Sequence, residues 1–286
     1  MDPVNFDNIL IVLVGTTHPG NIGAVARAMK TMGLRRLSLV NPKRFPCAQA
    51  SARAAGADDV LYEARVFDSM SAALADCHWV VGTSARVRSI QWPEFEPREC
   101  AERIVTAAKD GQVALVFGRE HSGLTNEELD RCHGVVRIPT DPGYRSLNLA
   151  SAVQVLSYEI RMASLTRSSA SISSNDRHQP IDSCYDEDRG NGLCAAPGME
   201  SEVEENPNAV GDNAGVQRTS RVSASEWEGF FQHLETSLQD IGYYDPARPK
   251  KLMRRLRRLF HRAGLERSEL NILRGILSAA QNAARK

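Results

Sequence analysis

Hydrophobic residues in the first half of the chain form two kinds of pattern that alternate with each other. The runs ILIVLV (9–14), VALVF (113–117) and GVVRIP (134–139) are largely apolar, as is typical of strands buried on both faces of a parallel sheet. Between such runs lie segments like IGAVARAMKTM (22–32), in which apolar residues recur at helical spacing. This alternation predicts an α/β domain with a mostly parallel sheet over residues 1–165.

The stretch IPTDPGYRSLNLASAVQV (138–155) joins one of these strands to a long helix. Pro142 and Gly143 fix a turn, and free N–H groups at the start of the helix favour a small polar ligand. Taken alone, the pattern also fits an ordinary strand-to-helix connection in which Ser146 or Asn148 caps the helix.

Two more polar loops follow predicted strands, GTSAR (82–86) and FGREHSGLTNEE (117–128). In the second loop, Thr125 followed by Glu128 has the sequence of a capping box, so a short helix should begin there. Open parallel sheets bind ligands beyond the carboxyl ends of their strands, so the three loops together predict a shared pocket. The glycines of residues 15–23 match neither the G-x-x-x-x-G-K-[ST] nor the G-x-G-x-x-G nucleotide motif.

The composition of the chain changes at residue 166. Residues 166–220 are rich in Ser, Asn, Gly and acidic residues, with four basic and ten acidic side chains and a formal charge of −6. We therefore predict a disordered acidic linker over residues 166–221. From Arg221 onward, thirteen Lys and Arg residues stand against seven Asp and Glu, a formal charge of +6. Hydrophobic spacing there predicts three helices, so residues 222–286 should form a small, all-helical, basic domain.

The second predicted helix of this basic domain, KKLMRRLRRLFHRA (250–263), has two different faces. Its apolar face carries Leu252, Leu256, Leu259 and Phe260. The other face carries most of its arginines, namely Arg254, Arg255, Arg257, Arg258 and Arg262. Such a face is either solvated surface or a contact for nucleic-acid phosphates.

The whole chain has 286 residues and no net charge, and 42% of its residues are hydrophobic, which is enough for a sizeable core. Its six cysteines form no C-x-x-C pair and no zinc-binding spacing. We therefore expect reduced thiols, no bound metal and a cytoplasmic location. The N-terminal segment has no basic region, and ILIVLV is too short for a signal sequence or a membrane span, so no membrane association is expected.

Three segments together resemble a known family. NIGAVARAMKTMG (21–33), LVFGREHSGLTNEE (115–128) and IPTDPGYRSLNLASAVQV (138–155) are similar, in order and separation, to the three motifs of the SPOUT RNA methyltransferases. They are most similar to those of the bacterial tRNA 2′-O-ribose methyltransferases. The resemblance covers residues 8–165 densely and the chain from about 222 more loosely. It implies a C-terminal trefoil knot in the sheet domain, a homodimer, and S-adenosylmethionine (SAM) as the methyl donor. The linker looks long for this family.

The resemblance also assigns roles to individual residues. The cofactor would contact Thr83, Ser84, Ala85, Gly118, Ile138, Arg145, Ser146 and Leu147. Catalysis would depend on Arg27, Ser146 and Asn148, and Glu120 matches the glutamate of the second motif. A guanidinium group stays protonated in proteins, so we expect Arg27 to be a fixed positive charge that stabilises the alkoxide forming on a ribose 2′-OH. Ser146 or Asn148 would position that hydroxyl. Without the motif, Arg27 would be interpreted as a solvated charge on a helix surface.

The activity implied by the resemblance is methyl transfer to the ribose 2′-OH of tRNA, at cytidine or uridine in position 32 of the anticodon loop. The residues expected to contact RNA phosphates are Arg86, Arg88, Arg254, Arg255, Arg257 and Arg258. No DNA partner is expected. Two alternatives remain open: a SPOUT enzyme that acts on ribosomal RNA or another tRNA ribose, and a non-catalytic RNA-binding module. The presence of Arg27, Ser146 and Asn148 argues against the non-catalytic module.

Overall fold

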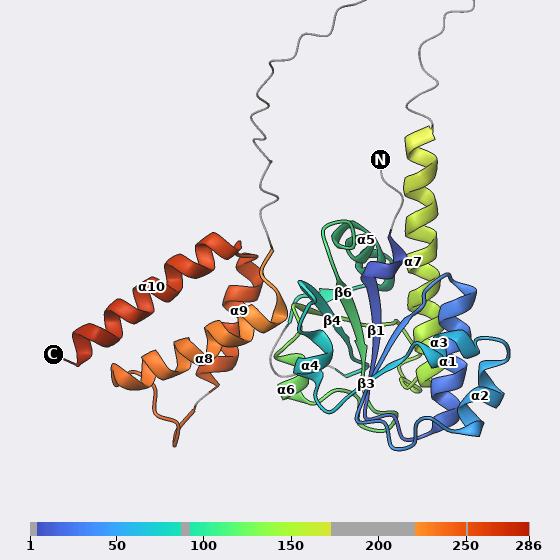
Figure 1. The fold of residues 1–286 in the computed structure, drawn as a ribbon, viewed down its shortest axis with the longest axis horizontal. Helices are drawn as coiled ribbons and strands as arrows, with labels where there is room; N and C mark the ends of the chain where they lie inside the picture. The colour runs from blue at the N-terminus through green and yellow to red at the C-terminus, as the bar shows by residue number, and fades with distance from the viewer. Residues whose placement is uncertain (1–4, 87–91, 173–220, 250, 286) are drawn as a thin grey trace, which may run out of the picture.

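A parallel sheet forms the centre of the larger domain in the computed structural model, which describes residues 5–86, 92–172, 221–249 and 251–285 (Figure 1). After a 3₁₀ turn at Phe6–Asn8, its strands are β1 (Ile9–Val14), β2 (Arg36–Val40), β3 (Arg65–Phe67), β4 (Trp79–Thr83), β5 (Glu94–Phe95), β6 (Val113–Phe117) and β7 (Gly134–Val136). The order across the sheet is β3-β2-β1-β6-β4-β7-β5. All neighbouring strands in this sheet run parallel, which confirms the predicted α/β class.

Helices cover both faces of the sheet (Figure 1). One face carries α1 (Pro19–Thr31), α2 (Ala48–Ala54), α3 (Asp58–Tyr62), α5 (Pro97–Ala107) and α7 (Leu149–Ile172). The other face carries α4 (Met70–Leu74) and α6 (Asn126–Leu129). In β1, Ile9, Ile11 and Leu13 belong to the first core, and Leu10, Val12 and Val14 belong to the second. The run is apolar throughout because successive side chains of a strand point to opposite faces, and both faces are covered.

Two short elements were not predicted from the sequence. They are the five-residue helix α3 and the edge strand β5, which lies just before α5. β5 is only two residues long and is defined by its pairing with β7. A segment of two to five residues spans too little sequence for a hydrophobic period to show.

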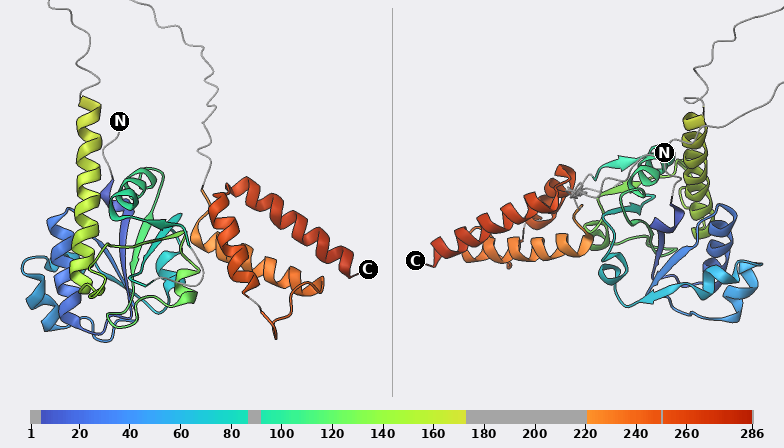
Figure 2. Two further views of the ribbon diagram at one scale, coloured as in Figure 1. Left: turned by 180° about the vertical axis from the view of Figure 1, so that it is seen from behind. Right: turned by 45° about the horizontal axis from the view of Figure 1, so that its top comes forward.

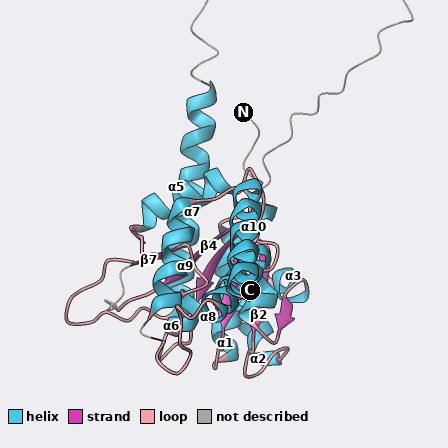
Figure 3. Cartoon of the chain, turned by 90° about the vertical axis from the view of Figure 1, so that its left-hand side faces the viewer, coloured by secondary structure: helices cyan, strands magenta, loops and turns pink. Residues whose placement is uncertain are grey.

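A smaller helical domain follows in the chain, made of α8 (Ala224–Asp240), α9 (Leu252–Ala263) and α10 (Arg267–Ala284). α8 and α10 lie side by side, and α9 lies next to them (Figures 2 and 3). Its core is built from Val222, Trp227, Phe230, Phe231, Leu234 and Leu270. The three predicted helices are confirmed, but Leu259 is 48% exposed, so the buried face of α9 is narrower than its sequence suggested.

The boundary of the predicted linker differs from expectation. α7 continues to Ile172, so the first residues assigned to the linker are helical, and residues 173–220 lie outside the described part of the chain. The strand order is consistent with the trefoil knot that the family resemblance implies, and the knot stays a prediction. Within the described ranges, no helix combines the length and the apolar character that crossing a membrane requires.

Candidate active site

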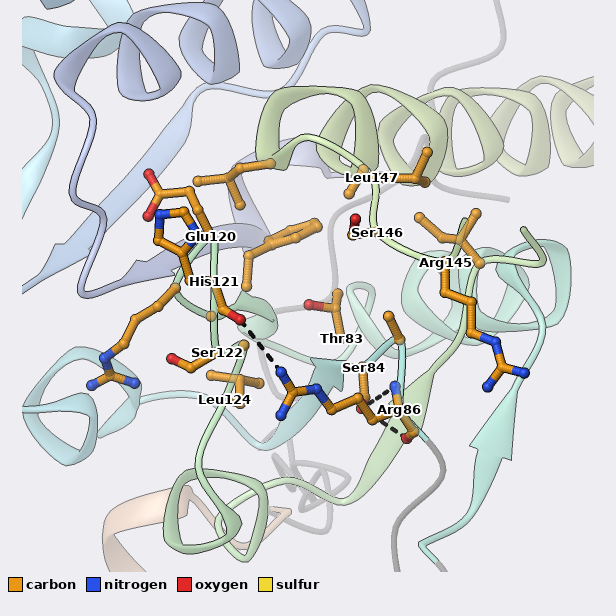
Figure 4. A pocket seen from close by; sticks show the side chains of 18 of the residues that line it. Thr83, Ser84, Arg86, Glu120, His121, Ser122, Leu124, Arg145, Ser146 and Leu147 are labelled. Atoms are coloured by element: carbon orange, nitrogen blue, oxygen red, sulfur yellow. Dashed lines mark hydrogen bonds between the residues drawn. The ribbon is translucent and has the colours of Figure 1, made fainter. Parts of the chain in front are cut away.

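A pocket lies at the carboxyl ends of β4, β6 and β7, where the three polar loops meet (Figure 4). These strands are neighbours in the sheet, so loops that are far apart in the sequence come together at one edge. All eight residues assigned to a cofactor line this pocket: Thr83, Ser84, Ala85, Gly118, Ile138, Arg145, Ser146 and Leu147.

The loop of residues 118–124 folds tightly back on itself beside the pocket. The Arg119 and Gly123 backbones exchange hydrogen bonds of 3.3 and 2.8 Å. A Cβ on Gly118 would lie 2.2 Å from the Leu124 nitrogen, and Gly123 has a φ of +68°, a conformation that other residues rarely adopt. These two glycines therefore allow the loop to fold back closely on its own backbone beside the pocket.

The short helix α6 anchors the same loop. Thr125 and Glu128 form the predicted capping box, with hydrogen bonds of 2.7 and 3.2 Å. The Glu128 carboxylate also accepts two hydrogen bonds of 3.0 Å from the guanidinium group of Arg119. Two-pronged pairs of this kind fix both partners in direction as well as distance. A residue of the pocket lining is thus tied to α6.

Glu120 ties the second motif to the first. Its carboxylate accepts hydrogen bonds from the backbone and hydroxyl of Thr17, the His18 backbone and the Asn21 side chain, at 2.9–3.2 Å. Partial burial acts to raise the pKa of Glu120, but these hydrogen bonds, led by that from Asn21, lower it to about 2. An acid this strong, with its oxygens already occupied, is a poor proton acceptor. Glu120 is therefore suited to hold the start of α1 in place.

Asn148 connects the third motif to the same network. Its side-chain nitrogen donates to the Asn21 oxygen at 3.2 Å, and its own oxygen accepts from the Ala150 backbone at 2.9 Å, which caps α7. Of the two cap candidates in the sequence, Asn148 is the one that caps. Glu120, Asn21 and Asn148 thus link all three motifs at one edge of the sheet.

Ser146 and Arg145 differ in whether their side chains already form hydrogen bonds. Both are exposed, and both line the pocket. Arg145 donates to the Pro142 carbonyl oxygen at 3.1 Å. Among the described residues, Ser146 has no side-chain hydrogen-bond partner, so its hydroxyl is available to a ligand.

Two of the three predicted catalytic residues, Asn148 and Arg27, are not part of the pocket lining. Asn148 is held at its edge by Asn21, whereas Arg27 has no such tie. It lies on α1, and its side chain is exposed, as the helical spacing predicted. Within the described ranges it has no hydrogen bond or ion pair, so none of these residues neutralises its charge.

Comparison with known proteins is consistent with this arrangement. Residues 8–158 match the SpoU rRNA Methylase family, and residues 225–286 match the C-terminal domain of the tRNA methyltransferase TrmJ. The chain belongs to the SpoU rRNA methylase family. The first match contains all three motifs and the whole pocket lining, and the second contains most of the helical domain.

Close relatives in this family match the chain over nearly its whole length. The tRNA (cytidine/uridine/adenosine-2′-O-)-methyltransferase TrmJ of Pseudomonas aeruginosa is 48% identical over 98% of this chain and 96% of its own. The tRNA (cytidine/uridine-2′-O-)-methyltransferase TrmJ of Photorhabdus laumondii is 47% identical over 98% and 99%. Among solved structures, TrmJ from Z. mobilis has a TM-score of 0.68 and 28% identity, covering 98% of this chain and 99% of that one. A probable methylase family protein from Haemophilus influenzae has a TM-score of 0.55 and 41% identity, covering 98% of both chains.

Several residues line the pocket of this SpoU family member without having been predicted. They include Phe117, Arg119, His121, Ser122, Leu124, Val136 and Thr140. Most of them lie inside the second or third motif, so the motifs themselves could have identified them. The hydrophobic pattern could not, because apolar residues such as Phe117 and Val136 look like ordinary strand residues from sequence alone.

Two arginines of α9 that were expected on an exposed face point inward. Arg254 forms an ion pair with Asp130, and Arg257 donates to both Glu228 carboxylate oxygens at 2.8 and 3.0 Å. The side chains of Arg254 and Arg257 are only 23% and 18% exposed. The predicted exposed face is therefore wrong for these two residues. Helical spacing cannot show that the sheet domain covers Arg254, or that α8 of the same domain covers Arg257.

The other arginines assigned to RNA contact have different positions. Arg255 is exposed, and Arg258 is half-buried. Arg262, which lies on the basic side of α9 but was not assigned to RNA contact, is also exposed. Arg86 lines the pocket and donates to the His121 carbonyl oxygen at 3.4 Å (Figure 4). Arg88 lies outside the described residues. Contact between these residues and RNA stays a prediction.

Proposed function

We propose that this chain is a SAM-dependent tRNA 2′-O-methyltransferase that modifies cytidine or uridine at anticodon-loop position 32. The observation that carries the proposal is the convergence on one pocket of the eight residues assigned to the cofactor, which come from three separate loops. The near full-length similarity to tRNA 2′-O-methyltransferases supports tRNA as the substrate. A tRNA substrate in turn supports a cytoplasmic location.

The residues of the pocket fit SAM. Buried Phe117, Leu124 and Val136 give it an apolar floor that suits a purine ring. The hydroxyl groups of Thr83, Ser84 and Ser146, together with loop backbone, provide polar partners around that floor. SAM would supply a methyl group bonded to a positively charged sulfur, which is the group to be transferred.

The chain's own residues would then position and activate the ribose. Ser146 has a hydroxyl available for the 2′-OH, while Asn148 is held by Asn21 and fixes the direction of the loop. Glu120 does not take the proton, because its oxygens are occupied and its pKa is about 2. The proton that leaves the 2′-OH as the methyl group arrives would pass to solvent, to which Ser146 is exposed. Arg27 would stabilise the developing alkoxide with an unneutralised charge and contact the adjacent phosphate.

We also infer that the protein works as a homodimer. α7 buries one side against the sheet, with Val153, Leu156 and Ile160 fully covered. Its opposite side exposes four large apolar residues at spacings of three and four, namely Val155, Tyr158, Met162 and Leu165. A repeat of this kind suits packing against another helix. Because Arg27 does not line the pocket of its own chain, we propose that it acts at the pocket of a second copy.

The test of the activity is methyl transfer from radiolabelled SAM into purified bulk tRNA and, separately, ribosomal RNA, followed by mapping of the modified nucleotide. We expect label in tRNA on a 2′-O-methylated cytidine or uridine at position 32. Label confined to ribosomal RNA, or to a different tRNA ribose, would replace the proposed substrate. If the protein binds SAM and tRNA but transfers label to neither RNA, the hypothesis that it is a methyltransferase is refuted.

A further inference from the structure

A one-turn helix separates the pocket from the helical domain. α6 and the residues after it, 130–133, contact the pocket loops on one side and the helical domain on the other. We call residues 130–133 the docking corner. Nothing in the chemistry proposed above uses it.

The pocket side of α6 touches two of the three cofactor loops. Arg119 of the pocket lining shares two hydrogen bonds of 3.0 Å with Glu128 of α6. Gly82, which directly precedes Thr83, has three side chains within 2.8–3.1 Å of where its Cβ would be, those of Leu124, Leu129 and Cys132. Protein interiors this closely packed transmit small displacements, so a shift of α6 would move both loops.

The other side of α6 leads directly into the ion pairs between domains. Asp130 follows Leu129, the last residue of α6, and pairs with Arg254 of α9. Arg131 donates to Glu228 of α8 at 3.1 Å. The Asp130 and Arg254 side chains are 13% and 23% exposed, against 35% and 27% for Arg131 and Glu228. The pair made by Asp130 is the more enclosed of the two, and it lies next to the helix that carries Glu128.

We propose that Arg254 is a positioning residue for the cofactor pocket. Through Asp130 it holds α6, and α6 holds the loop of residues 118–124 in the shape that binds SAM. Without Arg254, the carboxylate of Asp130 would be nearly buried and unpaired, a costly state that it would relieve by turning toward water and displacing the end of α6. This inference rests on the proposed function, since SAM is taken to be the ligand of the pocket.

The direct test is the SAM dissociation constant of full-length Arg254→Gln, measured by calorimetry without RNA. We expect binding to weaken at least about fivefold, the lower end of typical coupling between sites. Asp130→Asn should weaken it similarly, and Arg254→Lys should recover most of it because the ammonium can still pair. Arg285→Gln is the matched control: it removes an arginine and an ion pair with Asp240 inside the helical domain, and should leave SAM affinity unchanged.

A second measurement needs no variant. Coupling between two sites is reciprocal, so SAM should slow hydrogen exchange in residues 252–263 of the wild-type protein, far from the pocket lining. If folded Arg254→Gln binds SAM as tightly as wild type, or if SAM leaves exchange in α9 unchanged, Arg254 has no positioning role. If the wild-type protein itself does not bind SAM, the proposed function fails first, and the two failures are thereby distinguished.

Discussion

At the scale of single residues, the candidate site is held together by carboxylates and amides that have little spare capacity for chemistry. The side chains of Glu120 and Asn21 are already hydrogen-bonded to neighbouring loops. The Ser146 hydroxyl lines the pocket and is available to bind a ligand. Resemblance to the family predicted eight of the residues that meet in the pocket, but two of the predicted catalytic residues, Arg27 and Asn148, lie outside its lining. The resemblance did not predict that Glu120 accepts hydrogen bonds from the loop before α1. A motif gives the order of residue types, but it does not show which hydrogen-bond donors the folded chain places beside them.

The low pKa of Glu120 makes its contribution to stability depend on pH. Because its pKa falls from 4.5 to about 2 on folding, the stabilisation is fully present above about pH 4.5 and is lost as pH falls toward 2. We expect Glu120→Gln to lower the free energy of unfolding at pH 7, by an amount that shrinks steadily between pH 4.5 and 2. Urea unfolding at a series of pH values measures this. Glu63→Gln, at an exposed position, should show no such convergence with wild type.

At the scale of elements, the long apolar runs and amphipathic stripes were predictable, and the points where elements meet were not. β1 and β6 could be read directly because each is buried on both faces. The position of α9 could not be predicted in this way. The partners of Arg254 and Arg257 lie on other segments, which come close only when the chain folds. Local spacing fixes the faces of a helix, and tertiary contacts decide which of them meets solvent.

The exposed arginines of α9 give the prediction that belongs to this scale. If Arg255 and Arg262 contact tRNA phosphates, each contact releases counterions on binding. Replacing both with Gln should weaken tRNA binding for all tRNA sequences alike and flatten the slope of log affinity against log salt by up to about two units. SAM affinity should not change. Unchanged tRNA affinity and an unchanged slope would show that this face is only solvated.

A second prediction at this scale concerns the contact between the docking corner and α9. The ring centroids of His133 and His261 lie 4.5 Å apart. His133 Nδ1 accepts a hydrogen bond of 3.0 Å from the Val80 backbone N–H. Burial, with a smaller effect of His78, lowers the pKa of His133 to about 4. Between pH 6.5 and 4, the unfolded chain therefore binds a proton at this histidine that the folded chain does not bind. The free energy of unfolding should decrease as the pH is lowered from 6.5 to 4.

His133→Asn keeps an acceptor for the Val80 backbone and cannot be protonated in this range. We expect it to reduce the pH dependence of the unfolding free energy between pH 6.5 and 4 by up to about one proton. Chemical unfolding at pH 7.5, 6, 5 and 4.5 would show this as a shallower profile. A profile as steep as that of wild type would mean that other groups control the interval.

At the scale of the whole molecule, the proposed dimer places catalytic parts on different copies. Neither Arg27→Ala nor Ser146→Ala should be active alone. Mixed after unfolding and refolding together, they should recover about a quarter of the wild-type rate, since half of the dimers are mixed and each holds one complete site. Methyl transfer into tRNA measures the recovery. If the mixture stays as inactive as its components while dimers form, Arg27 acts within its own chain.

The central place of β1 has a consequence for how the protein is made. β1 lies between β2 and β6, and its pairing of Ile9 with Val113 joins segments roughly a hundred residues apart, a separation that slows folding. α1 likewise packs on α7. During synthesis, the first apolar strand therefore leaves the ribosome long before its second neighbour exists. Until β6 emerges, one edge of β1 is open to other chains. Newly made protein should therefore depend on chaperones most strongly before β6 and α7 have emerged.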